Sequence, residues 1–176
     1  MMKASIVFLT TVLLTVITLG GCSTSEQTKV PSNGPSAKAS SSKLDACSLL
    51  TKSDAESLTG ESAGPPSTSQ VGDTVSRCGY VSASGSKRVS LLARRASSTG
   101  EAIQIFKKAQ AESKGLSGSD PREIAGLGDA AYWAGGNLKQ LNVTKGDVWL
   151  IVSANVGGGD PLTASEAAAK KILARM

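Results

Sequence analysis

The sequence predicts an α+β domain, in which a mostly antiparallel sheet of about five strands packs with about three helices. Two observations favour this fold class. Five short segments carry strand patterns and are joined by brief connections rich in turn-forming residues. Three other segments open with a helix-capping pattern and continue with apolar residues at helical spacing. The expected order is helix, two strands, helix, three strands and helix.

The first helix is predicted from Thr51 to about Thr59. Asp54 follows Thr51 by three residues, which gives a capping box with aspartate in the place of glutamate, and Gly60 is placed to end the helix. Residues 61–74 are rich in turn formers and include two adjacent prolines. We expect this segment to be a surface loop.

A hairpin is predicted next, with strands at 77–83 and 87–94 joined by a turn at Gly85-Ser86. The side chains of the second strand alternate between two faces, and one of these faces is consistently apolar. That face carries Val89, Leu91 and Ala93, and the other carries Ser90, Leu92 and Arg94.

A capping box from Ser98 to Glu101 predicts a second helix that runs to about Ser113 and ends at Gly115. Strands at 130–133, 138–144 and 147–154 then form an antiparallel meander. The last of these strands is apolar on both faces, with Val148, Leu150 and Val152 on one and Trp149 and Ile151 on the other, so we expect it to be central.

A final helix is expected to run to the C-terminus, with Thr163 and Glu166 as its capping residues. The Gly157-Gly158-Gly159 run separates this helix from the last strand.

The start of the chain has the parts of a secretory signal. A basic residue, Lys3, is followed by an uncharged and largely apolar run at 4–19 and then by two small residues. The alternative, a retained transmembrane helix, is disfavoured because the run is shorter than the roughly 20 residues that a spanning helix needs.

The segment Leu19-Gly20-Gly21-Cys22 resembles the lipobox of bacterial lipoproteins, in which an aliphatic residue and two small residues precede a cysteine. In that class a diacylglycerol is attached to the cysteine thiol, signal peptidase II cuts before the cysteine, and the new amino group is usually acylated. The resemblance implies that residues 1–21 are a signal peptide and that Cys22 is lipidated. Several acyl chains on one residue give the stable membrane anchoring that one chain does not.

The resemblance also predicts where the protein works. Ser23 stands where an aspartate usually retains a lipoprotein at the inner membrane, so in a Gram-negative host we expect the periplasmic face of the outer membrane. In a host with a single membrane, the expected place is the outer face of the cytoplasmic membrane. The polar segment 22–43 is predicted to be a flexible tether, and residues 44–176 a single globular domain.

With Cys22 assigned to lipid, Cys47 and Cys78 remain. An even pair of cysteines in an exported protein predicts a disulfide, with two free buried thiols as the alternative.

Composition excludes several classes of function. The chain has no histidine, which removes Ser-His-Asp and Cys-His catalysis and most zinc sites. The net charge of +5 is spread along the chain without a block of five like charges, so a nucleic-acid partner is not expected. Weak attraction to anionic envelope polymers or lipid headgroups stays open.

Two glycine-containing motifs invite a ligand interpretation. Gly126-x-Gly128-x-x-Ala131 matches part of a dinucleotide fingerprint, but a predicted strand follows it where the fingerprint needs a helix, so we favour a turn. Gly157-Gly158-Gly159-Asp160 precedes a helix and has amides that could hold an anion, although a plain loop is favoured.

Three further patterns resemble sites for chemistry or modification. Ser84-x-x-Lys87 has the spacing of a serine–lysine hydrolase, but it falls in a predicted turn. A carboxylate pair is conceivable from the scattered acids, although solvated surface acids are the favoured interpretation. The Asn142-Val143-Thr144 glycosylation pattern lies in a predicted strand and carries little weight. The acids concerned are Asp120, Glu123, Asp129 and Asp147.

The mature part resembles small envelope lipoproteins of unknown function, chiefly from actinobacteria. The matching elements are Asp45-Ala46-Cys47-Ser48-Leu49-Leu50-Thr51, Cys78-Gly79-Tyr80 and Gly126-Leu127-Gly128-Asp129-Ala130-Ala131-Tyr132. This resemblance supports the fold and the disulfide but implies no activity.

These observations predict a membrane-anchored envelope lipoprotein that acts as a non-enzymatic binding or interaction domain, without a cofactor or a metal. Its partners are expected to be the membrane, through the lipid on Cys22, and an unidentified envelope protein or ligand. The alternatives are an envelope hydrolase with an unrecognised carboxylate site and a structural subunit of an envelope complex.

Overall fold

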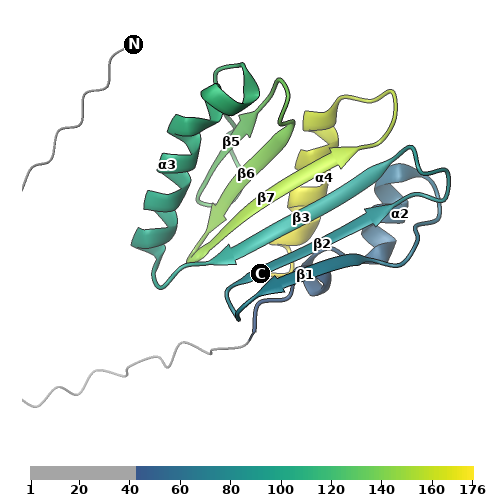
Figure 1. The fold of residues 1–176 in the computed structure, drawn as a ribbon, viewed down its shortest axis with the longest axis horizontal. Coiled ribbons are helices and arrows are strands. Elements are labelled where there is room, and N and C mark those ends of the chain that lie inside the picture. Colours follow the sequence, from purple (N-terminus) through teal and green to yellow (C-terminus); the bar gives the residue numbers. More distant parts are fainter. Residues whose placement is uncertain (1–42) are drawn as a thin grey trace, which may run out of the picture. The chain divides into compact units, whose positions relative to one another are not determined.

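The computed structural model describes residues 43–176. The predicted signal peptide, Cys22 and all but the last residue of the predicted tether lie outside the described residues. The described chain is an α+β domain, as predicted (Figure 1). It contains seven strands and four helices within residues 43–176, where the sequence analysis expects about five and about three.

All seven strands form one antiparallel sheet in the order β1-β2-β3-β7-β6-β5-β4. The central position predicted for the last strand, β7, is confirmed, because β7 pairs with β3 on one side and with β6 on the other. The strands are β1 (Ser67–Val71), β2 (Val75–Val81), β3 (Arg88–Arg95), β4 (Arg122–Glu123), β5 (Ala130–Ala134), β6 (Gln140–Lys145) and β7 (Val148–Asn155).

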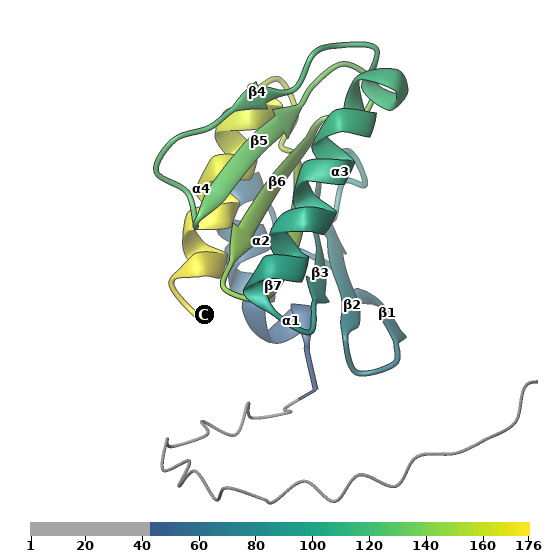
Figure 2. The ribbon, with the colours of Figure 1, turned by 90° about the vertical axis from the view of Figure 1, so that its left-hand side faces the viewer.

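The helices cover the two faces of the sheet unequally. Three of the four described helices pack on one face, and α3 alone packs on the other, over β5, β6 and β7 (Figure 2). The helices are α1 (Ala46–Leu49), α2 (Lys52–Thr59), α3 (Thr99–Ser117) and α4 (Pro161–Leu173). On the α3 side, β1 and β2 therefore have no helix of the described chain over them.

The main core lies between the sheet and the three helices α1, α2 and α4. Its fully buried side chains come from alternate positions of the central strands and from the inner side of α4. They include Leu91, Leu141, Leu150, Val152 and Ile172. A second, smaller cluster on the opposite face contains Phe106, Tyr132 and Ala134, with Leu138 and Trp149 packed against it.

The first predicted helix is confirmed as α2. Thr51 accepts a hydrogen bond from the Asp54 amide, the Asp54 carboxylate accepts one from the Thr51 amide, and Gly60 ends the helix in the left-handed region. The short α1 was not predicted. Its N-cap Asp45 accepts from the Cys47 amide.

The predicted disulfide between Cys47 and Cys78 is confirmed. It joins α1 to β2, and Cys78 is fully buried. The bridge therefore attaches the first helical segment to the sheet.

The interpretation of 61–74 as a loop without strands was wrong, because β1 lies within it. Every residue of β1 is exposed, so the segment lacks the apolar alternation that marks a half-buried strand. Its pairing with β2 determines its conformation. The two-residue β4 was also missed, since it is too short to carry a pattern.

Two helix boundaries were also wrong. The helix α3 passes through Gly115 and ends at Gly118, which has a φ of 74° and donates its amide to the Lys114 carbonyl. The N-cap of α4 is Asp160 rather than Thr163, because the Asp160 carboxylate accepts from the amides of Leu162 and Thr163. Proline at the first helical position reinforces this start.

No helix in residues 43–176 has the length and apolar character needed to cross a bilayer.

Candidate functional site

A pocket opens between α3 and the sheet because the inward side of α3 is built mostly from small residues. Phe106 is the one large buried side chain of this helix, and its ring meets that of Tyr132 edge to face, with centroids 4.9 Å apart. Beyond Phe106 the inward positions are Ala109 and Ser113, which do not reach the strands to fill the space.

The resulting cavity has a volume of about 250 Å³, and we call it the α3 pocket. Its lining combines apolar walls with several polar side chains from three adjacent strands. It is lined by Ala109, Glu112, Ser113, Leu116, Tyr132, Ala134, Leu138, Gln140, Asn142, Trp149 and Ile151.

Three polar groups in the lining of the α3 pocket lack a protein partner. Asn142 is 3% exposed and Tyr132 is 2% exposed, yet neither side chain forms a hydrogen bond with another described residue. The indole Nε1–H of Trp149 is buried and also unpaired within the described chain. Among buried side-chain nitrogen and oxygen atoms of the described residues, the Trp149 Nε1 is the one without a partner, which costs about 1–3 kcal/mol. The polar atoms of Tyr132 and Asn142 are not fully buried and are open to the pocket that they line. The three groups together point to a site for a hydrogen-bonding ligand.

Strand register brings these three groups together. Tyr132 on β5 is the direct cross-strand partner of Asn142 on β6, which is in turn opposite Ile151 on β7. Trp149 is two residues before Ile151 and therefore projects from the same face of the sheet.

The three polar groups on the sheet side of the α3 pocket are uncharged near neutral pH. Burial raises the pKa of Tyr132 to about 12, so its phenol stays protonated near neutral pH. An uncharged phenol, an amide and an indole can together donate hydrogen bonds to ligand oxygens and accept them from ligand amides or hydroxyls.

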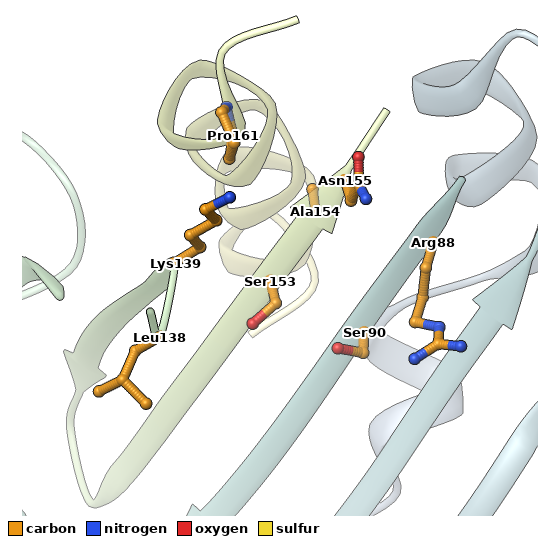
Figure 3. Close-up of a pocket in the computed structure, with 8 residues that line it drawn as sticks. All are labelled: Arg88, Ser90, Leu138, Lys139, Ser153, Ala154, Asn155 and Pro161. Carbon is orange, nitrogen blue, oxygen red and sulfur yellow. The ribbon is translucent and has the colours of Figure 1, made fainter. Parts of the chain in front are cut away.

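A second pocket lies on the same face of the sheet, beyond Leu138. It has a volume of about 210 Å³, and we call it the Arg88 pocket. Figure 3 shows Arg88 and Lys139 on opposite sides of the Ser90 and Ser153 hydroxyls. The remaining lining residues are Leu138, Ala154, Asn155 and Pro161.

The two pockets are neighbours along β7. Leu138 lines both, Trp149 and Ile151 belong to the α3 pocket, and Ser153 and Asn155 belong to the Arg88 pocket. We refer to the two together as the β7 groove.

The glycine motifs considered in the sequence are structural. Gly126 and Gly128 form the turn before β5, with φ values of 77° and 60°, and a strand follows them as expected. At Gly157-Gly158-Gly159-Asp160, the Asp160 carboxylate already accepts hydrogen bonds from the first amides of α4. An external anion would therefore compete with an internal one.

The Ser84-x-x-Lys87 pattern lies in the β2–β3 turn, as expected. The Lys87 ammonium is 3.0 Å from the Glu61 carboxylate and donates to the Thr59 carbonyl. The Ser84 hydroxyl exchanges hydrogen bonds with Ser82 and Ser86. This lysine is engaged as a cation, which does not suit it to act as a base toward Ser84.

Three of the four candidate acids form separate ion pairs. Asp120 pairs with Lys114 and Asp129 with Lys145. Asp147 pairs with Arg95. Glu123 is exposed on the edge strand β4.

Sequence reasoning missed the principal site residues. In the sequence Asn142 stands out only as part of a glycosylation pattern, and its near-complete burial makes it unsuitable for a sugar. Its polar side chain between apolar Leu141 and Val143 was the available signal. The sequence predicts that Trp149 and Ile151 form a second buried face, but the pocket over them depends on the small residues of α3.

Comparisons of the chain with models of protein families, with curated proteins and with solved structures find no match.

Proposed function

We propose that this chain is an exported lipoprotein, held to a membrane by lipid on Cys22, and that its domain binds a ligand in the α3 pocket without transforming it. The lipobox-like segment before Cys22 supports the anchor. The observation that carries the binding function is the convergence on one pocket of three polar groups without a protein partner, from Tyr132, Asn142 and Trp149, of which the Trp149 Nε1–H is fully buried.

The chemistry of the lining favours binding over catalysis. An amide and an indole do not transfer protons near neutral pH, and the phenol of Tyr132 has its pKa raised to about 12 by burial. Glu112 is an exposed acid on the α3 wall of the pocket. A single solvated carboxylate does not supply the acid and base pair that hydrolysis of glycosides uses.

The anchor is tested by fractionating cells that express the full chain or its Cys22→Ser variant. The full chain should sediment with membranes, and the variant should be released into the soluble fraction. A variant that stays with the membranes would refute lipid anchoring at this residue.

The binding function is tested with the full chain purified in detergent. The protein is incubated with an extract of small envelope molecules, exchanged into volatile buffer and examined by native mass spectrometry. The parent should retain a ligand that the Asn142→Leu variant loses, while Asn137→Leu, on the exposed turn before β6, serves as the matched control. Equal retention by the parent and the Asn142→Leu variant would exclude the α3 pocket.

A further inference from the structure

We infer that the ligand of the β7 groove is an extended oligopeptide whose free terminal carboxylate is held by Arg88 and Lys139. This inference rests on the proposed function, because it assigns the body of the ligand to the α3 pocket and its charged end to the Arg88 pocket.

Two unpaired cations define the charged end. Arg88 and Lys139 are both exposed, and neither forms an ion pair with another described residue. Many other cations of the described chain do have carboxylate partners: Lys52, Lys87, Arg95, Lys114, Lys145, Lys171 and Arg175. The lining of the Arg88 pocket contains no acidic residue, so a ligand anion there meets no repulsion from the walls.

The floor between these cations suits a carboxylate. Ser90 and Ser153 are direct cross-strand partners on β3 and β7, so their hydroxyls lie side by side (Figure 3). Both are small, which leaves room above them. A guanidinium can form two parallel hydrogen bonds with a carboxylate, and the hydroxyls and the Asn155 amide add further donors.

The spacing of the amide side chains suits an extended peptide. Gln140 and Asn142 are two residues apart on β6 and line the same pocket, and their side-chain amides form no hydrogen bonds with described residues. Side chains at this spacing repeat every ~6.6 Å, which is also the repeat of like-facing amides in an extended chain. The two side chains can therefore bond successive amides on one edge of such a peptide.

The length of the groove sets the length of the ligand. From Ile151 in the α3 pocket to Asn155 in the Arg88 pocket, β7 advances four residues, or ~13 Å at the rise of a strand. An extended peptide of about four residues covers this distance. Tyr132 is almost fully buried, so its ring offers no open platform for stacking a sugar or a base, which favours the peptide.

The test uses two peptide libraries that differ only in the terminal charge. N-acetylated tetrapeptides of uncharged residues are made as free acids and as C-terminal amides, and both sets are passed over the immobilised full chain. We expect the free acids to be enriched at least tenfold over the amides. Arg88→Gln combined with Lys139→Gln should abolish this preference, whereas Arg77→Gln, an exposed arginine on the same face outside both pockets, should preserve it.

Several outcomes would overturn the inference. The inference fails if free acids and amides are enriched equally, or if no peptide is retained. It also fails if the preference for free acids survives the Arg88→Gln and Lys139→Gln substitutions. If peptides fail while an envelope extract still yields a ligand that Asn142→Leu releases, the proposed function stands and the peptide assignment falls. A retained glycan or phosphorylated lipid would likewise replace the peptide. If Asn142→Leu releases nothing, both proposals fail.

Discussion

The Arg175 guanidinium lies 2.9 Å from the Asp54 carboxylate, although 121 residues separate them in sequence. Asp54 is 4% exposed and also completes the capping box of α2 with Thr51. Arg175 follows the end of α4 and donates to the Leu49 carbonyl as well. One carboxylate therefore joins α2 to the end of the chain that follows α4.

Removing this carboxylate should destabilise the fold. Asp54→Asn leaves Arg175 without its anion and weakens the start of α2, with an expected loss of about 1–3 kcal/mol in the free energy of unfolding. Urea denaturation of the parent and the variant at pH 7 measures the difference. Lys52→Gln, which breaks an exposed ion pair on the same helix, is the control and should change stability by less than about 0.5 kcal/mol.

The same pair predicts how stability depends on pH. Burial opposes ionisation of Asp54, but hydrogen bonds from Arg175 and Thr51 outweigh it and hold its pKa below the ordinary value of 3.8. A lowered carboxyl pKa contributes stability above the ordinary value and loses it as the pH falls through the folded value. The stability difference between the parent and Asp54→Asn should therefore be largest above about pH 5 and shrink below about pH 4. A difference that is constant across this range would contradict the assignment.

The disulfide should contribute strongly to stability. Cys47 and Cys78 are 31 residues apart, and closing a loop of this length is worth roughly 3–4 kcal/mol in the chain-entropy model. Replacing both cysteines by alanine should lower the unfolding free energy by about this amount, as measured by urea denaturation. Thiol labelling of the unfolded, unreduced parent should find both cysteines blocked, and two reactive thiols would contradict the bridge.

The sequence predicts those parts of the fold in which a local pattern coincides with burial. The capping box at Thr51 and the alternation along β3 and β7 correspond to elements with one or two buried faces. The strand β1 is exposed throughout and is specified by its partner β2, so no local pattern marks it. The sequence predicts a helix end at Gly115, but the left-handed residue is Gly118, a distinction that only the backbone reveals.

The candidate site was less predictable, because it arises from contacts between distant segments. Tyr132, Asn142 and Trp149 come from three strands, and the space above them exists because Ala109 and Ser113 are small. Arg88 and Lys139 lie 51 positions apart and line the same pocket only because β3, β7 and β6 are paired. A sequence shows which residues are polar or charged but not which of them lack a partner.

The backbone conformation of Lys139 should lower the free energy of unfolding, and the proposed role of its side chain in binding explains why a lysine stands there. Its φ of 49° is the one positive value recorded for a non-glycine residue of the described chain. A left-handed conformation costs an L-residue about 1–2 kcal/mol, so Lys139→Gly should raise the unfolding free energy by up to about 1 kcal/mol after the entropy of glycine is included. The same variant should lose the preference for free-acid peptides. Thermal denaturation measures the effect on stability, and the peptide enrichment measures the effect on binding. If Lys139→Gly is less stable than the parent, the contacts of the lysine side chain stabilise the fold by more than its left-handed backbone destabilises it.

The Asn142→Leu variant distinguishes a binding role of this residue from a structural one, because the two roles predict opposite changes in the free energy of unfolding. Leucine branches at the same atom as asparagine and has no polar atoms, and the α3 pocket next to Asn142 has room for its extra volume. Asn142→Leu therefore removes an amide without a protein partner and should leave the fold as stable as the parent or more stable by about 1–2 kcal/mol. Thr144→Leu, a matched change at the next inward position of β6, enlarges a fully buried residue and should be destabilising, by about 1–3 kcal/mol. Urea denaturation compares the two variants. If Asn142→Leu unfolds more easily than the parent, the amide has a structural role, and the α3 pocket would lose the observation on which its assignment as a binding site depends.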